Sequence, residues 1–361
     1  MSRARDFADL AGSADAGGLG GSNMVINGSM NISQRGTSST GLHDSGYYTV
    51  DRFALIFGNE DELRVTMSQN SVTDLPGFAN SLKVQTTTAE SAIAADESYY
   101  IINRYEGQDF QHLKYGTSNA LSTTLSFYVK SSVTGTFAVA IYQTDGNDII
   151  VSTYTINTAD TWEKKGITFA GNTLAAIVDD NTSAIMIDWF LAAGSNFTSV
   201  NNTSWGGYET GKLAYGHGTN AVATTTNATW EITGVQWELG EQATPFDHRS
   251  FGDELRRCQR YYYQTNDSEN SVHLQRSYNN LTYYYGQLDY PVTMRSQPTL
   301  TFQNASASVL LPSIHTTSCS WGALSRTNHS VIIEAQPGSD AGAYTYTAIC
   351  TSNSVRLDAE L

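Results

Sequence analysis

The sequence has few charged residues, few cysteines and no long apolar run. Charged residues make up 15% of the 361-residue chain, against about 25% in an ordinary globular domain. The three cysteines, Cys258, Cys319 and Cys350, are odd in number and lack metal-ligand spacing, which argues against a disulfide framework or a zinc site and predicts reduced thiols. No segment approaches the roughly 18 apolar residues of a membrane span, and the N-terminus lacks an apolar signal region. We therefore expect no membrane insertion, and folding in the cytoplasm where the chain is made.

Positive charge is also scarce. The formal net charge is −15 and the calculated isoelectric point is near 4.7. The summed field of such a chain repels phosphate backbones and anionic membrane surfaces. Nucleic acid is therefore excluded as an expected partner.

Common catalytic motifs are missing. The sequence contains no G-x-S-x-G, H-E-x-x-H, G-x-x-x-x-G-K-[ST] or C-x-x-C, which carry hydrolase, nucleotide and redox chemistry. Neighbouring carboxylates occur at Glu60–Glu62, Asp179–Asp180 and Asp253–Glu254. A glycosidase holds two carboxyls about 5 to 9.5 Å apart across one bond, whereas charge runs of this kind are typical of solvated surfaces. We expect no enzymatic activity.

Short alternating segments, rich in Ser, Thr, Asn, Gly and Tyr, dominate the rest of the sequence. Leu125, Phe127 and Val129 alternate with other residues, which predicts a strand with one buried face. Similar segments, separated by turn residues, recur at Phe137–Ile141, Ile149–Thr155, Lys165–Phe169, Ala184–Phe190 and Thr229–Leu239. The pattern predicts an all-β fold with a jelly-roll β-sandwich over residues 23–247.

Two local patterns refine this prediction. Asn27-Gly28 indicates a turn with positive φ, which these two residue types tolerate. In the last strand of the sandwich, Trp230 and Trp237 lie on either side of Gly234. Large aromatic residues on such strands usually face inward, so we expect both tryptophans to anchor the core.

The remaining segments define the domain boundaries. Residues 1–22 combine a short amphipathic stretch with a Gly/Ser/Ala-rich linker, typical of an attachment segment and hinge or of a frayed terminus. Residues 248–264 predict a linking helix, with Ser250 as its cap and Leu255, Cys258 and Tyr262 at helical spacing. Residues 265–361 return to alternating β and are long enough for a smaller C-terminal β-domain.

An ordered set of segments carries a family resemblance. These are SRARDFADLAG, NMVINGSMNISQRG, YTVDRF, VQWELGEQATPFDHRSFGDELRRCQRYYYQ, YPVTMRSQPTLTF and the terminal DAEL. In this order they resemble phage virion structural proteins of the tail-fibre kind. The resemblance implies a jelly roll similar to a carbohydrate-binding module, a homotrimer located in the virion, and contacts with other virion proteins through residues 1–22. It leaves the C-terminal domain either to oligomerise or to face the host.

The loop from Asn196 to Asn220 is the best candidate for recognising a host-surface glycan. It places Trp205, Tyr208, Tyr215 and His217 among Asn, Thr and Gly residues. Flat aromatic faces beside hydrogen-bonding groups suit a sugar-binding cleft. The alternative is that the loop packs these aromatic rings onto a sheet edge.

Calcium is the only cofactor that the resemblance suggests. Carbohydrate-binding jelly rolls often hold a structural calcium ion through carboxylate and carbonyl oxygens, and by analogy Asp51 and Glu238 are the candidate ligands. Asp145–Asp148 also looks calcium-like, but it lacks the rest of an EF-hand loop and is better interpreted as a hairpin turn.

The function expected from the sequence is that of a non-enzymatic tail-fibre or receptor-binding protein. Two alternatives stay open. The chain could instead be a capsid-decorating, head-fibre or tail-connector protein in which the jelly roll is a spacer. It could also be a tailspike-like glycan depolymerase, which would need carboxylates that converge across a groove.

Overall fold

The computed structural model confirms an all-β protein and describes most of the chain. The described residues are 23–59, 62–218, 221–265, 273–276, 283–302, 308–310, 316–337, 346–347 and 355–361. The predicted attachment segment, residues 1–22, lies outside them. The chain divides into two compact units, residues 1–254 and 255–360. No helix in the described residues is both long and apolar enough to span a membrane.

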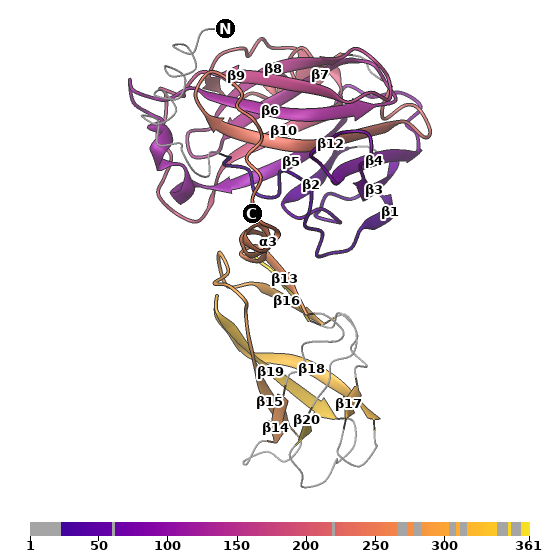
Figure 1. Cartoon of the computed structure of the whole chain (residues 1–361), viewed down its shortest axis with the longest axis vertical. Helices are drawn as coiled ribbons and strands as arrows, with labels where there is room; N and C mark the ends of the chain where they lie inside the picture. Colours follow the sequence, from indigo (N-terminus) through magenta and orange to yellow (C-terminus); the bar gives the residue numbers. More distant parts are fainter. Residues whose placement is uncertain are drawn as a thin grey trace. The chain divides into compact units, whose positions relative to one another are not determined.

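The first unit is a sandwich of two six-stranded antiparallel sheets (Figure 1). The first sheet has the order β1 (Ser38–Leu42), β3 (Arg64–Ser71), β4 (Asn80–Thr88), β12 (Thr229–Leu239), β6 (Thr123–Ser131) and β9 (Glu163–Phe169). The second has the order β11 (Gly206–Gly207), β8 (Asp148–Ile156), β7 (Gly135–Gln143), β10 (Ser183–Ala193), β5 (Ser98–Glu106) and β2 (Phe53–Gly58). Short helical turns lie between strands at η1 (Gly107–Asp109), η2 (Gln111–Leu113), α2 (Ser195–Thr198) and η3 (Thr210–Lys212). The strands predicted from alternation are confirmed.

The apolar sides of the two sheets enclose one core. Leu125, Phe127 and Val129 on β6 are fully buried, as is Trp189 on β10. Phe127 meets Trp189 edge to face, with ring centroids 6.2 Å apart. Alternation along each strand therefore produces the interior between the sheets, as the period of two requires.

A β-bulge in β12 explains why both of its tryptophans are buried. The pairing of β12 with β6 shifts register between Thr233 and Gln236, and Gly234 has φ +59°. An extra residue at a bulge reverses which face the following side chains occupy. Trp230 before the bulge and Trp237 after it consequently both face the core and have no exposed surface, which confirms the predicted anchors.

The Asn27-Gly28 turn differs in part from its prediction. Asn27 has φ +62° as expected, and its buried side chain bonds three backbone groups: it donates to the carbonyls of Ile32 and Asp51 and accepts from the Ile32 amide, at 2.8, 3.0 and 2.9 Å. Gly28 does not have positive φ. Gly28 instead lets the backbone of the turn pass close to β12, because a Cβ there would lie 2.0 Å from the carbonyl oxygen of Val235.

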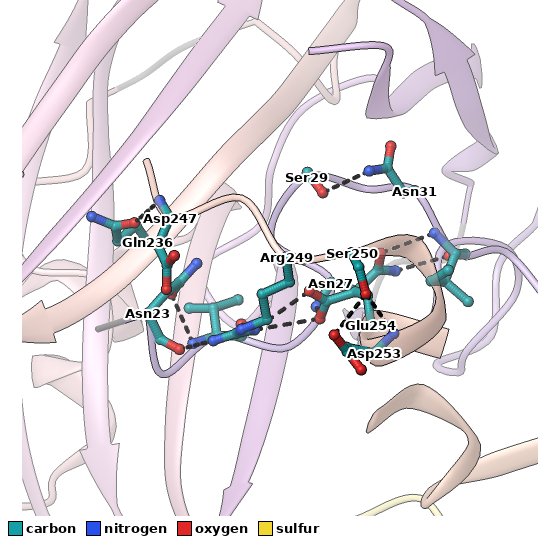
Figure 2. A network of polar contacts seen from close by, with 12 residues as sticks. Asn23, Asn27, Ser29, Asn31, Gln236, Asp247, Arg249, Ser250, Asp253 and Glu254 are labelled. Atoms are coloured by element: carbon teal, nitrogen blue, oxygen red, sulfur yellow. Dashed lines mark hydrogen bonds and ion pairs between the residues drawn. The ribbon is translucent and has the colours of Figure 1, made fainter. Parts of the chain in front are cut away.

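A buried polar network joins the start of the sandwich to its exit (Figure 2). Arg249 donates to the backbone carbonyls of Asn23 and Val25 and lies 3.4 Å from a carboxylate oxygen of Glu254. Glu254 in turn accepts the backbone N–H of Asn27. The side chain of Asn23 also bonds the backbone of β12. The network thereby fixes both ends of this unit to one strand.

Helix α3 (Phe251–Gln259) is shorter than the segment predicted for it. Ser250 caps it, since its hydroxyl accepts the Asp253 amide at 3.2 Å, as the sequence indicates. Cys258 is buried, whereas Tyr262 lies beyond the helix in β13. The helix ends at Gln259 because the chain then forms strand β13, which pairs with β21. This strand pairing places Tyr262 outside the helix, although its spacing from Leu255 and Cys258 fits a helix.

The second unit contains two antiparallel β-structures. A three-stranded sheet has the order β13 (Tyr262–Gln264), β21 (Val355–Asp358) and β16 (Thr299–Phe302). A closed barrel has the order β14 (His273–Arg276), β15 (Tyr284–Asp289), β19 (Ser330–Pro337), β18 (Thr316–Arg326), β17 (Ser308–Leu310) and β20 (Tyr346–Thr347). Val331, Ile333 and Leu357 are at the centre of its apolar cluster. This unit therefore has a core of its own.

The Asn27 turn gives the first testable prediction. Asn27→Ala should lower the free energy of unfolding by about 2 to 4 kcal/mol, because buried backbone groups lose their partners and an alanine is strained at positive φ. Asn27→Gly should lower it by about 1 kcal/mol less, since glycine tolerates the backbone conformation. Urea unfolding of both variants measures this. If both variants lose the same free energy of unfolding, the positive φ of residue 27 does not contribute to the difference from wild type.

Candidate functional site

The loop predicted to bind a glycan lies between β10 and β12, and its residues 219–220 are outside the described residues. It contains α2, β11 and η3, and β11 pairs with β8, which extends the second sheet by one short strand. The Tyr208 amide donates to the carbonyl of Asn147 at 2.7 Å, and the Ala214 amide to that of Phe197 at 2.9 Å. The bond from Tyr208 thus joins the loop to the turn between β7 and β8, and the bond from Ala214 joins two parts of the loop to each other.

Two of the predicted aromatic residues pack against the sandwich. The indole N–H of Trp205 donates to the carbonyl of Ala170 at 2.6 Å, and its ring meets Tyr115 edge to face at 5.7 Å. The ring of Tyr208 lies 5.2 Å from that of Tyr142. Both predicted residues are half-buried. In this arrangement they support the loop, as the packing alternative describes.

The loop does form one wall of a pocket of about 460 Å³. Small residues where β10 ends, including Ala193 and Gly194, leave the space open, and Ser195, Thr198 and Thr224 contribute hydroxyl groups to its lining. Of the four predicted residues only His217 lines it. Tyr215, like Trp205 and Tyr208, is not part of this lining.

His217 enters the pocket as a neutral hydrogen-bonding group. Its Nδ1 lies 3.2 Å from the backbone amide of Ala138, whose N–H it accepts, and its ring meets Phe137 edge to face at 5.8 Å. Burial lowers the pKa of His217 to about 4, because a charged imidazolium is disfavoured away from water. With Nδ1 as acceptor, Nε2 carries the proton. A lining with a neutral imidazole and the hydroxyl-bearing residues Ser195, Thr198 and Thr224 suits a ligand rich in hydroxyl groups.

The two residues suggested for calcium are each occupied by protein donors. Asp51 accepts the backbone amide and the side-chain amide of Gln34, the first at 2.9 Å. Glu238 accepts the amide of Thr244 at 2.9 Å and its hydroxyl at 2.6 Å. Among the described residues no group of three or more His, Cys, Asp or Glu side chains could hold a metal ion. Calcium binding by Asp51 and Glu238 stays a prediction, and nothing below depends on it.

Asp188 is an unusual residue that no local pattern in the sequence indicates. It lies on β10 between two inward-facing residues, Ile187 and Trp189, and is 3% exposed. Its Oδ1 has no hydrogen-bond partner among the described residues. Burial raises the pKa of Asp188 to about 7, against the opposing effect of Arg104. Its carboxyl group is therefore partly protonated near neutral pH.

The buried carboxyl of Asp188 predicts a pH-dependent stability. Because the pKa of Asp188 is raised above its ordinary value of about 3.9, the folded protein holds this proton more tightly than the unfolded chain does. The resulting contribution to the free energy of unfolding is complete at low pH and is lost as pH rises through 7. Asp188→Asn should accordingly stabilise the protein at pH 8 by about 1 to 3 kcal/mol more than at pH 5. Urea unfolding of both proteins at the two pH values measures the difference. A gain of equal size at both values would contradict the raised pKa.

The comparisons with known proteins find similarity in structure only. No protein-family model matches the sequence, and no curated protein matches it. The enzymatically active domain of bacteriophage CBA120 tailspike protein 4 matches with 14% identity and a TM-score of 0.33, over 61% of this chain and 22% of that one. The family 11 carbohydrate-binding module of Clostridium thermocellum cellulase Lic26A-Cel5E matches with 10% identity and a TM-score of 0.30, over 57% and 98%. An arabinose-bound α-L-arabinofuranosidase matches with 9% identity and a TM-score of 0.33, over 63% and 30%.

Proposed function

We propose that this chain is a non-enzymatic phage virion protein of the tail-fibre or receptor-binding kind, which recognises host-surface glycans through the pocket at His217. The observation that carries the glycan assignment is this pocket of about 460 Å³, with its hydroxyl groups and neutral imidazole. Its volume lies within the usual range for ligand sites, and a few fixed polar groups in a concave site orient such ligands. The virion assignment rests on the ordered resemblance of the sequence to tail-fibre proteins.

The placement of the carboxylates supports a binding role rather than hydrolysis. No Asp or Glu is among the described residues that line the pocket, whereas glycoside hydrolysis commonly uses two carboxyls that face one bond. Among the neighbouring carboxylates in the sequence, Glu254 is bound to Arg249 and the Asn27 amide, and Asp180 bonds the adjacent Thr182. These groups serve local structure.

The proposed fibre is a homotrimer. Light scattering of the purified full chain at micromolar concentration should give three times the 39.3 kDa mass of one chain. The same value should persist on tenfold dilution, since virion fibres are stable assemblies. A mass equal to one chain at both concentrations would refute the trimer while leaving the glycan pocket untested, so the binding experiment below uses an independent readout.

Glycan recognition is tested by filling the pocket. Ser195 lines the pocket and is exposed, so Ser195→Trp should fold normally and occupy the space. On an array of bacterial surface glycans we expect the wild type to bind a defined subset and Ser195→Trp to bind it at least tenfold more weakly. The matched control is Thr203→Trp, an exposed position in the same loop outside the pocket, which should bind like wild type.

Two outcomes would contradict the proposal in different ways. Equal loss in both tryptophan variants would show that the loop, and not the pocket, determines binding. The bound glycan should also yield no new reducing ends on prolonged incubation with the wild type. Release of reducing ends would identify a depolymerase instead of a receptor-binding protein.

A further inference from the structure

A second pocket, of about 550 Å³, lies on the outer face of the first sheet. Its floor comes from β6, β9 and β12, and its walls come from the β3–β4 loop and from residues 241–248, here named the return segment. The lining residues are Pro76, Gly77, Phe78, Ser126, Tyr128, Lys164, Gly234, Ala243, Thr244, Pro245, Phe246 and His248. It shares no lining residue with the pocket at His217, which belongs to the second sheet.

Hydrogen bonds to β12 hold the return segment in place. Glu238 accepts both the amide and the hydroxyl of Thr244. Gln236 accepts the amide of Asp247 at 2.7 Å and donates to Thr244 and to the carbonyl of Pro245. Gln236 and Glu238 are themselves buried. The wall that the return segment forms is therefore fixed by buried polar contacts.

Aromatic rings line this pocket in contact with one another. The ring centroid of Phe78 lies 5.4 Å from that of Tyr128 and 5.1 Å from that of Phe246, and Phe246 lies 4.7 Å from His248. Gly234 makes room beneath them, since a Cβ there would lie 2.7 Å from the Phe78 ring and 3.0 Å from the Tyr128 ring. The bulge that orients the core tryptophans thus also seats the rings of this pocket.

The lysines of this face differ in whether a carboxylate pairs with them. Lys83 lies 3.7 Å from Glu231, and Lys130 lies 3.8 Å from Glu231 and 3.2 Å from Asp74. The ion pairs neutralise both of these lysines. Lys164 forms no ion pair with any described residue, is exposed, and has its ammonium 5.9 Å from the centre of the Tyr128 ring. Lys164 therefore places a positive charge beside an aromatic ring of the pocket lining.

We propose that this pocket binds a carboxylate-bearing sugar residue, such as a uronic acid. The Phe78 and Tyr128 rings offer apolar faces to a pyranose ring. The ammonium of Lys164 forms a charge-assisted bond to the sugar carboxylate. An acidic peptide would use the cation but would gain little from the paired aromatic faces.

The experiment compares two probes that differ only at the carboxylate. The full chain is titrated with methyl β-D-glucuronide and with methyl β-D-glucoside at low ionic strength, and binding is followed by ligand-observed NMR. We expect the glucuronide to bind at least fivefold more tightly. Lys164→Gln should abolish that preference, whereas Lys114→Gln, which removes an exposed lysine outside the pocket, should keep it.

Further variants separate this site from the pocket at His217. Tyr128→Leu should weaken both sugars, because it removes an aromatic face, and Ser195→Trp should leave glucuronide binding unchanged. Equal affinity for the two sugars, no binding of either, or an unaltered preference in Lys164→Gln would each overturn the proposal. Loss of glucuronide binding in Ser195→Trp would instead place the ligand at His217. Tighter binding of a tetraglutamate peptide than of the glucuronide would replace the sugar with an acidic protein partner.

Discussion

The arrangement of the first unit depends on the burial of polar side chains along β12. One face of this strand carries Trp230 and Trp237 into the core, and the opposite face buries Glu231, Gln236 and Glu238. Buried polar groups must be hydrogen-bonded, because an unmet donor or acceptor costs about 1 to 3 kcal/mol. Ser81 and Asn70 donate hydrogen bonds to Glu231. The return segment meets the requirement for Gln236 and Glu238. The path of the chain out of the sandwich, and with it the wall of the second pocket, follows from that requirement.

The second sheet covers its outer face by a different means. An apolar cluster that includes Phe190 and Ala214 lies there, with Tyr142 and Tyr208 packed against it. The loop after β10 therefore adheres through apolar and aromatic contacts supplemented by backbone bonds. Asp188 is the exception, because its carboxyl is buried and its Oδ1 has no hydrogen-bond partner in the part of the chain that the structure describes. Covering one face with polar bonds and the other with apolar contacts leaves pockets of different chemistry on the two sheets.

Much of the architecture could be predicted from the sequence, because alternation and turn residues act locally. The strand around Phe127 and the cap at Ser250 follow from spacing of a few residues. The inward tryptophans of β12 are predicted from residue type, and the bulge between Thr233 and Gln236 is what places both on one face. The extent of α3 could not be predicted, since the pairing of Tyr262 with a strand almost a hundred positions later decides where the helix ends. The second pocket could not be predicted from the sequence either, because it too depends on contacts between distant parts of the chain. It joins Phe78, Tyr128 and the return segment, whose proximity depends on strand order and on the bulge at Gly234.

The two pockets differ in how their binding should respond to salt. Neutral groups line the one at His217, so its contacts depend on hydrogen-bond geometry and change little as ions are added. The contact proposed for Lys164 is between unlike charges at an exposed position, where screening is effective within about 10 Å at 0.1 M salt. The overall charge of −15 adds a repulsion toward acidic ligands that salt also screens. Added salt therefore weakens the attraction between Lys164 and the sugar carboxylate but also weakens the overall repulsion. The attraction to Lys164 acts at shorter range and dominates once the ligand is bound. Acidic sugars should therefore dissociate faster as salt rises, while binding at His217 persists.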